Sequence, residues 1–165
     1  MRQITIEQAM SQDAESYLGT LHLAYINWKD EAKKAAGQGK KFDKCQPEHS
    51  LSTAQYYALL SCQEAHNDYL KAIGAPGAYY DGHNGSTGDE GAHKEWVRMA
   101  KARWTGEGGI RDAIREAQQC DRSSNLWAAL DFAVIRKERV PYLLGSVKAL
   151  ANVLNRHFSK GKKQR

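Results

Sequence analysis

Apolar residues recur at steps of three and four positions over most of this chain, and no other feature constrains its fold as strongly. This spacing places the residues on one face of an α-helix, whereas a half-buried strand shows strict alternation. No long alternating stretch competes with the helical spacing. The sequence therefore predicts an all-α protein, a helical bundle of five or six helices.

Capping residues divide the pattern into segments. The first expected helix is unusually long and covers residues 5–36, from a capping box of Thr5 and Gln8, with a bend near Gly19. A second capping box, Ser52 with Gln55, begins a helix that runs to residue 73.

Four shorter stretches complete the expected bundle. Helices are predicted over residues 90–104 and 110–120, separated by the breaker TGEGG. Ser123 or Ser124 is the expected cap of the next helix, and Pro141 marks either a kink or the start of a last helix that ends at Phe158.

The chain length of 165 residues corresponds to one domain, large enough to bury a core without disulfides or metals. We expect a helical domain over residues 1–158, interrupted at 74–91 by an irregular loop with glycine at every third position from Gly82 to Gly91. Residues 159–165 are basic and are expected to form a flexible tail.

Cysteine usage and hydropathy indicate the compartment. Three cysteines make a sparse, odd-numbered set, which argues against a disulfide framework. The first fifteen residues carry acidic side chains and no apolar run, and no stretch approaches the length needed to span a bilayer. The sequence predicts a cytoplasmic protein without a membrane partner.

The net charge of +5 is unevenly distributed. Residues 123–165 contain nine Lys or Arg and two Asp or Glu, while each of the two preceding thirds carries a slight acidic excess. Concentrated positive charge attracts phosphates or acidic proteins. We therefore expect a non-catalytic accessory protein that binds nucleic acid, or a nucleoprotein complex, through a basic C-terminal helix and tail. The expected phosphate-binding residues are Arg136, Lys137, Arg139, Lys148, Arg156, Lys160, Lys162 and Lys163.

An adaptor or inhibitor that docks on a larger protein is the alternative from another class. The long first helix, the aromatic residues and the glycine-rich loop are compatible with this function.

Two Cys-x3-His patterns raise the hypothesis of a zinc site. The candidate ligands are Cys45 with His49 and Cys62 with His66, since thiolate and imidazole both bind zinc. Each half is mixed, however, and Cys62 and His66 also lie on the apolar stripe of their helix, so a core role is favoured over metal binding. No cofactor is expected otherwise.

An enzyme is the remaining, unsupported class. His83 and His93 stand near carboxylates in and beside the glycine-rich loop, a combination suited to acid–base chemistry. Solvated loop polarity explains the same residues, and no nucleophile elbow or zinc-protease motif is present.

Overall fold

A computed structural model describes residues 16–74 and 90–162 of the chain. The secondary structure of these residues is entirely helical, which confirms the predicted fold class. The elements are α2 (Tyr17–Gly37), α3 (Thr53–Ala72), α4 (Glu90–Thr105), α5 (Ile110–Cys120), α6 (Leu126–Ala128), the π-helix η1 (Ala129–Ile135), the 3₁₀-helix η2 (Pro141–Leu143) and α7 (Leu144–Lys162).

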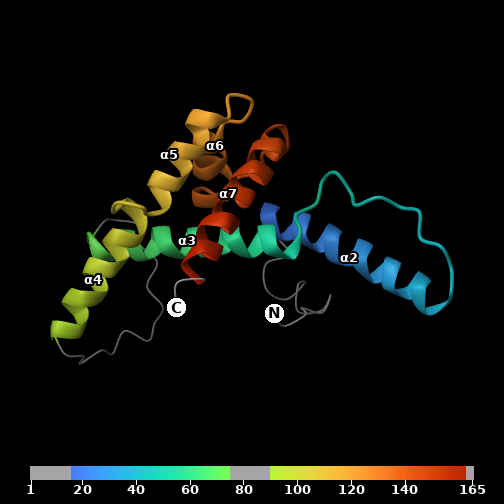
Figure 1. The fold of residues 1–165 in the computed structure, drawn as a ribbon, viewed down its shortest axis with the longest axis horizontal. Coiled ribbons are helices and arrows are strands. Elements are labelled where there is room, and N and C mark those ends of the chain that lie inside the picture. The colour runs from blue at the N-terminus through green and yellow to red at the C-terminus, as the bar shows by residue number, and fades with distance from the viewer. Residues whose placement is uncertain (1–15, 75–89, 163–165) are drawn as a thin grey trace.

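Helix α3 lies at the centre of the molecule (Figure 1). It packs against α7, α4, α2 and η1, and α5 packs beside α7. Leu59 and Cys62 of α3 are fully buried in the same cluster as Leu150 and Leu154 of α7. The predicted apolar stripe of α3 therefore faces the core over Leu59 and Cys62, whereas its last member, Ile73, is 46% exposed.

Only the first two turns of α2 belong to the core. Its buried residues all fall between Tyr17 and His22, and the rest of the helix projects away from the body (Figure 1). The segment 38–49 runs back along this projection and is held there by Trp28, whose indole Nε1 donates to the carbonyl oxygen of Lys44 at 3.0 Å. We refer to residues 23–49 as the α2 arm.

The expected helix starts are partly confirmed. Ser52 caps α3 and Gln55 returns a side-chain hydrogen bond to the Ser52 backbone, so this capping box is present as predicted. The described part of the first helix begins at Tyr17, with Ser16 as its cap. The predicted capping box of Thr5 and Gln8 lies outside the described residues.

The predicted cap of the fifth helix is wrong. Asn125 caps α6 by accepting a hydrogen bond from the amide of Ala128 at 3.0 Å. Ser123 and Ser124 instead donate to the carboxylate of Asp121, which organises the turn before the helix. An Asx or ST turn competes locally with a helix cap, and sequence spacing alone does not distinguish them.

The helix then widens into a π-helix at Ala129. Such segments are rare and usually short, because their backbone geometry is less favourable than that of the α-helix. Here the widened turn is held from α3, since the Gln63 side chain donates to the carbonyl oxygen of Val134 at 2.9 Å. Lys137 ends the segment with a φ of +57°, a left-handed conformation that is uncommon for residues other than glycine.

The C-terminal region is more helical than expected. Pro141 begins η2, which leads directly into α7, so it starts the last helix and does not kink it. Helix α7 continues past Phe158 to Lys162, which corrects the predicted flexible tail for residues 159–162; residues 163–165 lie outside the described part. Phe158 packs on the core and thereby holds the turn that follows it.

The predicted glycine-rich loop falls mostly outside the described residues. Gly74 ends α3 in a left-handed conformation, with a φ of +65°. At the other end α4 begins at Glu90, which confirms the start predicted for the helix 90–104; Glu90 and Gly91 are therefore helical and not part of the irregular range.

The breaker between α4 and α5 forms a tight turn as predicted. Gly108 adopts a φ of +71°, and the Gly109 amide donates to the Gly106 carbonyl oxygen at 2.9 Å. A Cβ atom at Gly109 would lie 2.8 Å from the carbonyl oxygen of Ala102 and 2.9 Å from that of Arg103. Backbone surrounds this position, so only glycine fits without moving the helix.

Gly109→Ala is therefore expected to lower the free energy of unfolding by about 1–3 kcal/mol, because overpacking against backbone has no flexible side chain to relieve it. Gly145→Ala is the matched control, since a Cβ at Gly145 meets nothing within 4 Å. In this exposed helical position alanine should raise stability by about 0.5–1 kcal/mol. Urea denaturation followed by circular dichroism measures both, and equal effects would contradict the turn geometry.

His22 is the one imidazole that the described core encloses. Its side chain is 2% exposed, stacks on Tyr56 with ring centroids 4.2 Å apart, and lies 3.2 Å from the Thr53 hydroxyl. Burial lowers the pKa of His22 to about 4, because the charged form loses its hydration.

This burial predicts acid sensitivity. The unfolded chain binds a proton at His22 below about pH 6.5, whereas the folded chain binds one only near pH 4. The contribution of neutral His22 to the free energy of unfolding is therefore fully present above about pH 6.5 and is lost as the pH falls from 6.5 to about 4. In His22→Phe, which keeps the stacked ring, the loss of unfolding free energy between pH 7 and pH 4 should be smaller by about 2–3 kcal/mol. His93→Phe, an exposed control on α4, should keep the wild-type pH dependence in denaturation series.

Candidate nucleic-acid interface

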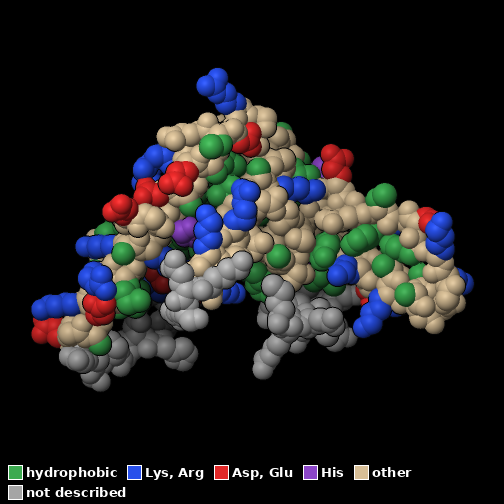
Figure 2. Space-filling model, viewed as in Figure 1, with side chains coloured by type: hydrophobic (Ala, Val, Ile, Leu, Met, Phe, Trp, Pro, Cys, Tyr) green, Lys and Arg blue, Asp and Glu red, His purple; other side chains and the backbone are tan. Residues whose placement is uncertain are grey.

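The outward side of α7 carries cations and no acid. The helix contains four Lys or Arg side chains and no Asp or Glu between Leu144 and Lys162. We define the α7 face as the residues Lys148, Asn152, Asn155, Arg156, Ser159 and Lys160. All of them are exposed except Lys148, which is half-buried. Figure 2 shows Lys and Arg side chains over the middle of the front of the molecule, where α7 runs.

The core fixes which side of α7 faces solvent. Val147, Leu150 and Leu154 are fully buried, and their opposite side is the α7 face. Two contacts add to this alignment. The Gln55 side chain donates to the Asn152 amide oxygen at 3.0 Å, and the Lys148 ammonium donates to the backbone carbonyl oxygen of Glu48.

Arg103 of α4 lies beside the C-terminal end of α7, although the sequence hypothesis did not include it. Its guanidinium carbon lies 5.8 Å from the centroid of the Phe158 ring. The pKa of His157 is lowered, first by burial and then by the positive charges of Lys160 and Arg103. Cations from two helices therefore meet at the C-terminal end of α7. About fifty residues separate Arg103 from this end, and no sequence signal indicates their proximity.

A groove runs beside the α7 face. It has a volume of about 320 Å³ and lies between α7 and the end of α5. Its lining combines apolar and polar side chains: Ala117, Cys120, Asp121, Leu126, Ala149, Asn152, Val153 and Arg156.

The groove is lined by one anionic side chain, Asp121, and one cationic side chain, Arg156. Asp121 directs its carboxylate to the hydroxyl of Ser123 at 2.6 Å and to the Ser123 amide at 2.8 Å, and these hydrogen bonds lower the pKa of Asp121. Within the described part of the chain, Arg156 forms no ion pair, so its guanidinium is open to an anionic ligand.

The structure separates the predicted basic residues into two groups. Lys148, Arg156, Lys160 and Lys162 belong to α7, and Lys163 lies outside the described residues. Arg136, Lys137 and Arg139 instead follow η1, where the chain meets the start of α2.

The residues of the second group have neighbours of their own. The Arg136 Nε lies 3.3 Å from the Asp131 carboxylate, and its guanidinium also covers the Phe132 ring. Arg139 lies over the Tyr17 ring at 5.9 Å. Lys137 lines a cavity of about 10 Å³ at this junction.

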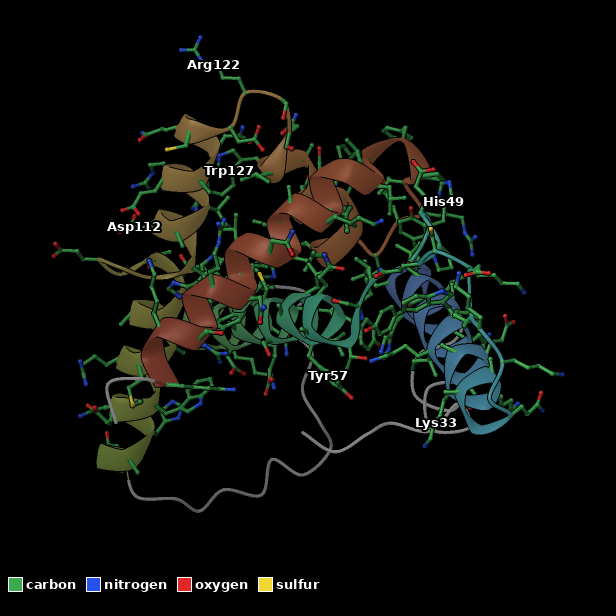
Figure 3. All side chains as sticks on the ribbon, turned by 45° about the vertical axis from the view of Figure 1, so that its right-hand side comes forward. Lys33, His49, Tyr57, Asp112, Arg122 and Trp127 are labelled. Atoms are coloured by element: carbon green, nitrogen blue, oxygen red, sulfur yellow. The ribbon has the colours of Figure 1, made fainter. Side chains whose placement is uncertain are left out.

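The two Cys-x3-His pairs occupy different environments. Cys45 and His49 are exposed on the segment that follows α2, and His49 lies near the start of α7 (Figure 3). Cys62 is fully buried, and His66 packs on Trp104 with ring centroids 4.9 Å apart. The core interpretation of Cys62 is thus confirmed. Among the described residues, no group of three or more His, Cys, Asp and Glu side chains is arranged to hold a metal ion.

Of the two histidines proposed for acid–base chemistry, the structure describes only His93. His83 and its neighbouring carboxylates lie outside the described residues. His93 is exposed on α4, where it stacks near Trp96 with ring centroids 6.1 Å apart.

Comparison of the chain with protein-family models, with curated proteins and with solved structures finds no significant match in any of the three. Of the helices in residues 16–74 and 90–162, none has the length and apolar character required to cross a membrane.

The cysteine environments predict two classes of thiol. Burial raises the pKa of Cys62 to about 12, whereas Cys45 and Cys120 are exposed. A thiol-specific chromogenic reagent at pH 8 should label Cys45 and Cys120 rapidly and Cys62 only on unfolding, because the thiolate is the reacting form. Cys62→Ala, which removes the slow phase, identifies the residue. Rapid labelling of all three thiols in the native protein would contradict the buried position of Cys62.

Proposed function

We propose that this protein binds nucleic acid without catalysis, through the α7 face together with Arg103. The observation that carries the proposal is a helix of 19 residues whose solvent-exposed side bears cations and whose sequence contains no acid. Neutralising phosphates with Lys and Arg releases condensed counterions, and this release provides most sequence-independent affinity for nucleic acid.

The dimensions of the face support contact with several phosphates. Lys148 and Lys160 are separated by twelve helical positions, which corresponds to about 18 Å along the axis. An α-helix enters the major groove of a duplex, where phosphates line both edges. Arg156, Lys160 and Arg103 are the proposed phosphate contacts, since all three are exposed.

Two amides give the face a means of contacting groups other than phosphate. Asn152 and Asn155 are exposed on the same side of α7 as the cations. Amide side chains donate and accept hydrogen bonds at once, so they suit base edges and sugar hydroxyls. Asn152 and Arg156 also border the groove beside α5, which offers room for part of the bound backbone.

Arg136, Lys137 and Arg139 have a secondary place in this proposal. The Asp131 carboxylate offsets the charge of Arg136, and the group sits at the α2 junction and not on α7. We assign these residues to the outer positive field that attracts a polyanion, while the α7 face makes the contacts.

The projecting α2 arm favours a second candidate function, docking on a larger protein. Tyr25, Trp28 and Phe42 form a half-buried aromatic group on the arm, away from the core. Aromatic side chains are enriched at protein interfaces. If the protein docks through the α2 arm, binding of the larger protein should not depend on the α7 cations. Variants of these cations therefore separate the two candidate functions.

The test is a salt titration of binding to a labelled duplex of about 20 base pairs and to its single strand, followed by fluorescence anisotropy. The double variant Arg156→Gln/Lys160→Gln should reduce the slope of log K against log salt concentration by about 2 for the duplex, because two phosphate contacts are lost. Affinity in low salt should fall by about tenfold or more.

The matched control is Lys33→Gln/Arg122→Gln, which removes the same charge from exposed positions away from α7 (Figure 3). Its slope should equal that of the wild type. If the control pair weakens binding as much as the α7 pair, only net charge matters and the proposed interface is wrong. If neither probe binds, docking through the α2 arm becomes the leading function.

A further inference from the structure

The groove between α5 and α7 adjoins the α7 face and has room for more than a phosphate. Its volume of about 320 Å³ lies at the lower end of the range of about 300–1,000 Å³ found for pockets that hold small molecules. Asn152 and Arg156 belong both to the lining of the groove and to the α7 face. A strand whose phosphates lie on that face therefore passes the opening of the groove.

Apolar side chains line the groove from both of its sides. Ala117 comes from α5 and Leu126 from the start of α6, while Ala149 and Val153 come from α7. Proteins that hold a base outside its stack pack apolar or aromatic side chains against the flat faces of that base. The lining of this groove provides apolar surface for such a contact.

Two polar side chains of the lining keep hydrogen-bonding atoms for a ligand. The Asn152 amide oxygen accepts from the Gln55 side chain at 3.0 Å, so the amino group of Asn152 remains as a donor. One Asp121 oxygen accepts hydrogen bonds from Ser123 and Ser124, whereas the other accepts none from the residues that the structure describes. The edge of an unpaired base carries donors and acceptors, and these two side chains supply a partner for each kind.

The charges of the groove match the two ends of a nucleotide. Asp121 and Arg156 both line it, yet within the described part of the chain they form no ion pair with each other. The guanidinium suits a phosphate, and the carboxylate suits the N–H groups of a base. A ligand that is anionic throughout would be repelled by Asp121, and an apolar ligand would leave both charges without a partner.

We propose that this groove binds one unpaired base of the nucleic acid, with Arg156 on the adjacent phosphate and with Asn152 and Asp121 at the edge of the base. The inference rests on the proposed function and adds that the ligand is single-stranded where it crosses the groove. Bases within a duplex are stacked and paired, so they enter such a site only after they are flipped out.

Fluorescence anisotropy with three DNA ligands tests the proposal: a single strand of about 20 nucleotides, its duplex, and an abasic strand of the same length. The abasic strand keeps every phosphate and lacks only the bases. At equal salt concentration, the wild type should bind the ordinary strand about three- to tenfold more tightly than the abasic strand, because the base adds one or two hydrogen bonds.

The variant Ala117→Leu/Ala149→Leu narrows the groove from both sides and changes no charge. It should bind the ordinary and abasic strands equally, keep the wild-type salt dependence, and bind the duplex as the wild type does. The matched control is Ala32→Leu/Ala35→Leu, because these alanines are also half-buried in a helix but lie on the α2 arm. The control should keep the preference for the ordinary strand.

The reactivity of Cys120 gives a measurement that needs no variant. Cys120 is exposed and lines the groove, whereas Cys45 is exposed on the α2 arm. Saturation with the ordinary strand should slow the reaction of Cys120 with the thiol reagent and leave the rate at Cys45 unchanged.

The outcomes separate the inference from the function on which it rests. If none of the three DNA ligands binds, the proposed function fails and the base-binding groove fails with it. If the ordinary and abasic strands bind the wild type equally, or if bound strand leaves Cys120 fully reactive, the proposed function stands and the groove does not bind a base.

Discussion

The crossing of α7 over α3 is the contact on which the rest of the structure depends. Leu59 and Cys62 on one helix and Leu150 and Leu154 on the other are fully buried. Burial of each of the three leucines contributes roughly 1.5–3 kcal/mol, so the crossing supplies a large part of the stabilising free energy. Helices α4 and α5, the π-helix η1 and the first turns of α2 pack around this pair.

The same crossing determines where the polar chemistry lies. Because the buried side of α7 is fixed by leucine and valine, its lysines, arginine and asparagines are held together on the opposite side. Conversely, the core takes Cys62 out of contact with solvent and places His66 against Trp104. Packing on α3 thus leaves the cations of α7 on the surface and buries Cys62, while His66 stays partly buried against α4.

Two features of the fold extend away from this core and have little local support. The α2 arm is closed by the Trp28 indole hydrogen bond, an exposed ion pair between Lys44 and Glu31 and a few aromatic contacts. The first half of α4 contains no buried residue. Short isolated helices are marginal in water, and most helical stability in proteins comes from tertiary packing.

The sequence by itself determined the helical class, most helix boundaries and the identity of the core stripe on α3. These features depend on local spacing and on residues that satisfy helix ends, such as Ser52 with Gln55 and the glycines of TGEGG. The sequence also indicated the excess of positive charge in the C-terminal region. It did not indicate that this charge divides between α7 and the η1–α2 junction.

Tertiary structure decided how the basic residues divide between α7 and the η1–α2 junction. It also decided three further features that depend on groups far apart in the chain. Gln63 supports the π-helix from α3, and the Phe158 contact extends α7 beyond its expected end. Arg103 approaches the end of α7 because α4 and α7 both pack on α3. The position of the cap was decided locally: Asp121 accepts hydrogen bonds from Ser123 and Ser124, and Asn125 caps the helix in their place. The spacing of apolar residues indicates which side of a helix is buried. Which other helix covers that side depends on the packing of the whole chain.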